Sequence, residues 1–118
     1  MKRALTALLL AAAFACAATV TLVNGTRGWV LNGVFVRSAD SGSDWGEDRL
    51  GDEGFIGIGA GWTLEVDPGV YDIRVEDTDG DGYIRLSVPV ETAFRWKVTL
   101  EDMNDPLSTV NPVYTWGG

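Results

Sequence analysis

The sequence predicts one small all-β domain, an antiparallel β-sandwich of about six or seven strands of the immunoglobulin-like or prealbumin-like type, after an N-terminal signal peptide. The main observation is a hydrophobic pattern with a period of two, which indicates strands with one buried face. Gly, Pro, Asn and Asp residues separate these stretches at short intervals and predict turns. The chain has 118 residues, enough for one modest core.

The first 17 residues have the pattern of a signal peptide. Lys2 and Arg3 precede an apolar run over residues 4–15, and small residues follow at 15–17. The run is about twelve residues, shorter than the roughly 20 that span a bilayer as a helix. We therefore expect export to the periplasm or the extracellular space, and we expect no membrane span.

Cys16 is the only cysteine, and it lies at the expected cleavage site. It is a candidate for lipidation, as in bacterial lipoproteins. The bulky Phe14 stands where a small residue is usual, which favours ordinary cleavage after Ala17 or Ala18. The mature domain then contains no disulfide and folds by packing alone.

We expect the sandwich domain over residues 18–105, with residues 106–118 as a tail and candidate last strand. The alternation is clearest from Phe94 to Leu100, and it also predicts that Ile84, Leu86 and Val88 face inward. Asn24-Gly25 is expected to form the first turn. The predicted strands cover residues 19–24, 28–37, 62–66, 70–76, 83–90 and 94–100.

Residues 41–51, which contain a Ser-Asp-Trp-Gly…Leu-Gly element, resemble a pattern found in small secreted bacterial β-sandwich proteins. The same proteins carry a Tyr-Asp-Ile-Arg-Val strand followed by an Asp-Gly-Asp turn, and these match residues 71–75 and 79–81 here. The resemblance covers most of residues 19–102. It implies a secreted β-sandwich and no particular activity.

Charge and composition exclude several function classes. The chain has 17 acidic and nine basic residues, a formal net charge of −8 and no histidine. Such a charge repels nucleic acid and anionic lipid surfaces. Without histidine or a mature cysteine, zinc sites and His- or Cys-dependent catalysis are not expected. We therefore expect a monomeric domain that is not an enzyme.

The distribution of the acidic residues predicts a charged pole. If the six strands alternate in direction, the connections after Arg37, Val75 and Leu100 lie at one end of the sandwich. Calcium prefers carboxylate and carbonyl oxygens, which loops at such an end supply. These connections hold thirteen of the 17 acidic residues, namely Asp40, Asp44, Glu47, Asp48, Asp52, Glu53, Glu76, Asp77, Asp79, Asp81, Glu101, Asp102 and Asp105.

Residues 77–82 match the first half of an EF-hand loop, with Asp at positions one, three and five and Gly at position six. Position twelve is Val88 instead of Glu, so a true EF-hand is rejected. Two interpretations remain, a plain hairpin turn and a turn that also binds calcium. Ca²⁺ is the one cofactor predicted, with Asp44, Asp48, Asp77, Asp79, Asp81 and Asp102 as its candidate ligands.

Trp45 offers an alternative function. An aromatic ring in a polar loop is suited to stack on a sugar, which predicts a module that binds a glycan or an envelope protein. The opposing interpretation is that Trp45 folds back as a plug over the end of the sandwich. A third hypothesis is an assembly subunit, whose aromatic tail from Val110 to Trp116 pairs with the sheet edge of a neighbour.

Overall fold

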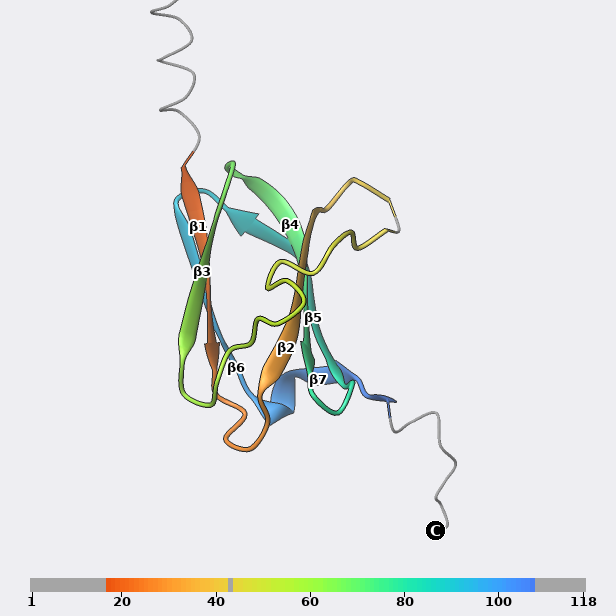
Figure 1. Ribbon diagram of the computed structural model, residues 1–118. Coiled ribbons are helices and arrows are strands. Elements are labelled where there is room, and N and C mark those ends of the chain that lie inside the picture. The colour runs from red at the N-terminus through yellow and green to blue at the C-terminus, as the bar shows by residue number, and fades with distance from the viewer. Residues whose placement is uncertain (1–16, 43, 108–118) are drawn as a thin grey trace, which may run out of the picture.

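Two β-sheets form the body of the protein (Figure 1). The structure is a computed structural model and describes residues 17–42 and 44–107. The strand orders are β3-β1-β6 and β2-β4-β5-β7, so the predicted small all-β sandwich is confirmed. The strands are β1 (Ala18–Asn24), β2 (Leu31–Ser38), β3 (Gly61–Val66), β4 (Gly69–Asp77), β5 (Gly82–Val90), β6 (Ala93–Val98) and β7 (Met103–Asp105), and a short 3-10 helix, η1 (Leu100–Asp102), precedes β7.

Some sequence predictions concern segments outside the described residues. These are most of the signal peptide, including Cys16, and the tail segment from Val110 to Trp116. They stay predictions. No helix within residues 17–42 and 44–107 is long and apolar enough to cross a membrane.

The core lies between the two sheets and follows the period-two pattern. In β1, alternate residues from Ala18 to Asn24 are buried, and those between them are half-buried. Each fully buried aliphatic side chain contributes about 1.5–3 kcal/mol through removal from water. The largest of the fully buried hydrophobic residues are Tyr83, Leu22, Leu31, Ile56 and Ile73.

A bulge in the β4–β5 pair changes which side chains of β5 face the core, so one prediction from the sequence is wrong. The register shifts between Tyr71 and Ile73, and Ser87 on β5 has a left-handed φ of 57°. Tyr83 and Val88 are buried, whereas Leu86 is 62% exposed and does not face the core as predicted. A bulge changes the face that later residues present, and the period-two rule does not anticipate it.

The strand directions differ from the predicted alternation. β1 pairs antiparallel with β3 and parallel with β6, although the alternation required the opposite in both cases. The error arises between β2 and β3, where residues 39–60 run back along the length of the molecule (Figure 1). In constant-type immunoglobulin domains the first two strands share a sheet, whereas β1 and β2 lie in different sheets here. The prealbumin-like alternative stays a prediction.

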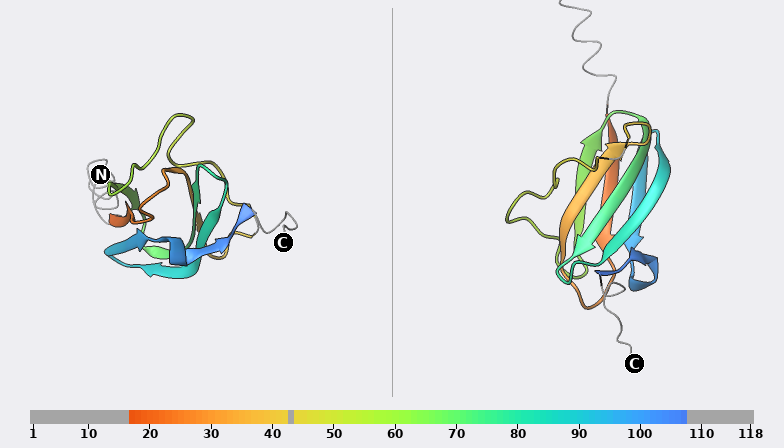
Figure 2. Two further views of the ribbon diagram at one scale, coloured as in Figure 1. Left: turned by 90° about the horizontal axis from the view of Figure 1, so that it is seen from below. Right: turned by 90° about the vertical axis from the view of Figure 1, so that its right-hand side faces the viewer.

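Residues 39–60 cover the free edge of β2 (Figure 2). Ile56 forms a two-way backbone bridge with Leu31. The Arg49 N–H donates to the Val34 carbonyl at 2.7 Å, and the Val34 N–H donates to the Asp48 carboxylate at 2.9 Å. An uncovered edge strand is a template for aggregation, so this segment protects the four-stranded sheet.

A buried polar network, here called the Asn24 hub, closes one end of the sandwich. The Asn24 amide donates to the carbonyls of Trp29 and Ile56, at 2.8 and 3.0 Å. Its oxygen accepts bonds from the N–H and the hydroxyl of Thr26. Asn24 and Thr26 are each only 1% exposed. The hub therefore joins β1, the β1–β2 loop and the segment that edges β2.

We call this end of the sandwich the hub end, defined by residues 25–30, 78–81 and 99–102. The β1–β2 loop joins its neighbours at this end, because the Gly25 N–H donates to the Val98 carbonyl at the end of β6 and the Thr78 N–H donates to the Val30 carbonyl. The opposite end, the hairpin end, carries the turns at residues 67–68 and 91–92 (Figure 1).

Candidate functional site

The predicted single acidic pole is wrong. The acidic residues that follow Val75 and Leu100 do share the hub end, and the Leu107 N–H there donates to the Asp81 carboxylate. The segment after β2, however, leaves from the hairpin end, where Ser38 pairs with Tyr71 and the Ala39 N–H donates to Val70. Because that segment returns along β2, its carboxylates spread along the sheet edge.

Asp44 and Asp48 belong to this edge segment. The Asp44 carboxylate accepts the Gly46 N–H at 3.0 Å and closes a local turn. The Asp48 carboxylate accepts the N–H groups of Val34 and Leu50, at 2.9 and 3.0 Å. Asp48 thus takes the place of a missing neighbour strand at the edge of β2.

Asp77 organises the β4–β5 turn at the hub end. One of its oxygens accepts the N–H groups of Asp79 and Asp81, and the other accepts the Tyr83 hydroxyl at 2.8 Å. Asp77 is 2% exposed. Burial, followed by the hydrogen bond to Asp77, raises the pKa of Tyr83, so the phenol stays a donor. Asp79 is exposed on the turn.

Asp102 caps η1. One of its oxygens accepts the Thr99 N–H at 2.9 Å and the Trp96 indole N–H at 3.2 Å. The six predicted calcium ligands are therefore divided between the β2 edge, the β4–β5 turn and the η1 cap. Within the described part of the chain, no group of three or more metal-ligating side chains gathers.

Trp45 lies beside β2, near the hairpin end. The Arg37 guanidinium stands over its ring, 3.9 Å from the centroid, and donates to Asp72 at 3.0 Å. The ring is half-buried, and Arg37 occupies one of its faces. The indole thus stacks on a charged side chain at the sheet edge, whereas the plug hypothesis placed it over the end of the sandwich.

Asp72 ties this stack to the bulge in β5. Its second oxygen accepts the Ser87 N–H at 2.9 Å. The Ser87 N–H and then Arg37 lower the pKa of Asp72 below its usual value, and burial acts in the opposite direction. The left-handed backbone conformation of Ser87 is therefore explained by this bond, because it directs the Ser87 N–H toward the buried Asp72 carboxylate.

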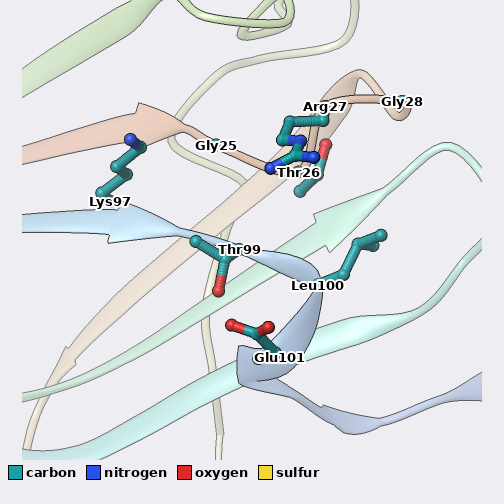
Figure 3. Close-up of a pocket in the computed structure, with 8 residues that line it drawn as sticks. All are labelled: Gly25, Thr26, Arg27, Gly28, Lys97, Thr99, Leu100 and Glu101. Carbon is teal, nitrogen blue, oxygen red and sulfur yellow. The ribbon is translucent and has the colours of Figure 1, made fainter.

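Sequence reasoning missed a groove at the hub end, which has a volume of about 590 Å³ (Figure 3). It lies between the β1–β2 loop and the end of β6, and it presents Arg27, Lys97 and Glu101. An added Cβ at Gly25 would approach Lys97 Cε and Cγ to 2.9 Å, so a larger residue there would have to shift the Lys97 side chain. The other residues that line the groove are Gly25, Thr26, Gly28, Thr99 and Leu100.

Within residues 17–42 and 44–107, two basic groups at this groove have no carboxylate partner. Arg37, Arg74 and Arg85 form ion pairs, whereas Arg27 and Lys97 form none. The only sequence signal for the groove was a Gly-flanked Arg27, a pattern shared with many ordinary turns. Of the seven basic residues in the described part of the chain, Arg49 and Arg95 also form no ion pair, but this groove is lined by two such cations, which makes it the candidate binding site.

No family model, curated protein or solved structure matches this chain. The resemblance of residues 41–51 to small secreted proteins stays a prediction. In the structure these residues, Ser43 excepted, belong to the segment that edges β2. The functional argument therefore rests on the geometry of the groove and of the Trp45 stack.

The Asp72 carboxylate predicts a specific dependence of stability on pH. A carboxyl whose pKa is lowered by folding stabilises the fold above its unfolded pKa of about 3.9, and this contribution is lost as the pH falls through the folded pKa. We expect Asp72→Asn to reduce the free energy of unfolding by about 1–3 kcal/mol at pH 7. The difference from the wild type should shrink below pH 4 in urea titrations.

The exposed Asp40 provides the control, since Asp40→Asn should change the free energy of unfolding by less than about 0.5 kcal/mol. A difference between wild type and Asp72→Asn that stays constant from pH 7 to the acid limit of the fold would contradict the role given to Asp72.

The hydrogen bonds of Asp77 predict the response to calcium. A cation that took Asp77 as a ligand would compete with the N–H donors of Asp79 and Asp81 and with the Tyr83 hydroxyl. We expect millimolar calcium to leave the melting temperature within about 1 °C of its value in chelator. A rise of several degrees that is abolished by Asp79→Asn would contradict this and restore the calcium interpretation of the turn.

Proposed function

We propose that this chain is an exported binding domain, not an enzyme, and that its recognition surface is the hub end. The observation that carries the proposal is that the β1–β2 loop is held by the buried Asn24 hub and at the same time lines an open groove. A loop fixed in advance loses little entropy when it binds a ligand. Binding residues are commonly found on loops held by a rigid scaffold.

The other hub-end loops support the same proposal. Asp77 fixes the β4–β5 turn through two backbone N–H groups, and Asp102 fixes the η1 segment through Thr99. These carboxylates are occupied by internal bonds. The unpaired charges left at the groove are therefore the groups with capacity to bind a ligand.

Export is the second part of the proposal. β1 begins at Ala18, directly after the predicted signal peptide of residues 1–17. Ala18 is 1% exposed and pairs with Val66. Cleavage after Ala17 leaves the central strand of its sheet whole, whereas cleavage after Ala18 removes a buried residue. We therefore assign the mature N-terminus to Ala18.

A glycan-binding surface at Trp45 is the second candidate. The ring is half-buried and its other face is not covered by Arg37, which favours stacking on a sugar from that side. The two candidates lie at different places on the molecule. Variants at each place can therefore distinguish them.

Export and binding are tested on the same protein. The full chain is expressed in a Gram-negative host, the exported form is collected, and its intact mass is expected to match a start at Ala18. This protein is then applied to arrayed envelope polysaccharides and peptidoglycan fragments. We expect binding that Gly28→Tyr abolishes, because Gly28 lines the groove and the open space around its Cβ admits a bulky ring at the groove wall.

Gly57→Tyr is the matched control, since Gly57 is equally open and does not line the groove. It should bind like the wild type, and so should Trp45→Ala. Binding that is lost in Trp45→Ala and retained in Gly28→Tyr would transfer the function to the Trp45 surface. A protein that stays inside the cell, or that binds neither the arrayed polymers nor any small ligand at the groove, would refute the proposal.

A further inference from the structure

The charges of the hub-end groove have a definite arrangement. Arg27 comes from the β1–β2 loop, and Glu101 comes from η1 on the other side (Figure 3). Lys97 belongs to β6, and its aliphatic stem lies against Gly25. The Thr26 and Thr99 hydroxyls already take part in internal hydrogen bonds. Two cations and one carboxylate are therefore the charged groups left for a ligand.

Arg27 occupies a backbone conformation that an arginine rarely adopts. Its φ is 71°, in the left-handed region that favours glycine, and such residues cluster at functional sites. Ser87 is the other described residue of this kind besides glycines, and its strain is explained by its bond to Asp72. In the loop at Arg27, glycine would satisfy the backbone without strain. The arginine instead contributes a cation at the groove.

The surroundings limit what this cation can bind. Asp79, Asp81 and Asp102 lie at the same end of the sandwich, and the whole chain carries a net charge of −8. A polyanion would be repelled by these carboxylates. A single carboxylate would gain a charge-assisted hydrogen bond from Arg27, and the charge of Lys97 on the neighbouring β6 would add attraction. Glu101 offers a complementary partner to an ammonium group on the same ligand.

We infer that the groove binds a small zwitterionic ligand, such as an amino acid or a short peptide, with its carboxylate at Arg27 and Lys97 and its ammonium group at Glu101. The inference rests on the proposed function and names the ligand class of the same site. The exposed Leu100 supplies an apolar surface for the part of the ligand between its two charges.

The test compares three probes of equal chain length on the mature, exported protein. They are 6-aminohexanoate, hexanoate and hexylamine, titrated to tens of millimolar at constant ionic strength. Amide NMR shifts of Gly25, Gly28 and Thr99 report binding at the groove. We expect saturable shifts with 6-aminohexanoate and about tenfold weaker binding of the two singly charged probes.

Two variants test which charged side chain binds which charge of the ligand. Arg27→Gly removes the cation at a backbone position that suits glycine, so the melting temperature should change little while binding of 6-aminohexanoate falls about tenfold. Glu101→Gln should reduce its affinity to that of hexanoate. Arg95→Ala is the control, because Arg95 is an unpaired cation on β6 outside the groove, and this variant should bind like the wild type.

Three results would overturn the inference: no saturable shift with any probe, equal affinity for all three probes, or an Arg95→Ala loss as large as that of Arg27→Gly. If envelope binding is blocked by Gly28→Tyr while the probes fail, the ligand class is wrong and the proposed function stands. If envelope binding maps to Trp45, the proposed function itself fails.

Discussion

The hydrogen bonding of the buried Asn24 side chain is the constraint on which the hub end depends. Burying an amide without partners is unfavourable by about 1–3 kcal/mol. Here both ends of the amide are satisfied, by carbonyls of two separate segments and by Thr26. The network is formed only when β1, the β1–β2 loop and the β2 edge segment are all in place. It therefore links the fold of the sandwich to the shape of the groove.

Six of the 17 acidic residues accept hydrogen bonds from backbone N–H groups, namely Asp44, Asp48, Asp72, Asp77, Asp81 and Asp102. Asp48 pairs with the edge of β2, Asp77 holds a turn, and Asp102 caps η1. Short carboxylate side chains are well suited to this, because they reach backbone donors a few residues away. Loop structure and sheet pairing thus account for about a third of the acidic residues. In the described part of the chain a few cations have no carboxylate partner, and we place ligand binding at two of them, Arg27 and Lys97.

The sequence predicted the fold class and six of the seven strands, because period-two burial is a direct consequence of strand geometry. It did not predict strand direction after β2. Direction there depends on residues 39–60 returning along an edge. Contacts that no periodicity reveals hold this segment there, among them the Asp48 bond to Val34 and the bridge between Ile56 and Leu31. Asn24-Gly25 was interpreted as a turn, and the chain does leave β1 there. That interpretation did not predict that the Asn24 side chain is buried and hydrogen-bonded.

The candidate site was predicted less well, and the reason is chemical. An Asp-x-Asp-Gly-Asp pattern is compatible with binding calcium or with binding N–H groups, since both are attracted to carboxylate oxygens. Only the position of the donors decides between them, and Asp77 is surrounded by donors. The groove had almost no sequence signal, because its charges come from segments about 70 residues apart that become neighbours only through the parallel pairing of β1 with β6.

The central claim is that the Asn24 hub holds the hub end as firmly as the core. Native-state hydrogen exchange tests it most directly, through the amide protons of Thr26 and Trp29, which donate within the hub. The account predicts that they exchange only through openings about as unfavourable as those that release the buried β1 amides. Exchange of both protons as fast as that of the exposed Gly28 amide would contradict it.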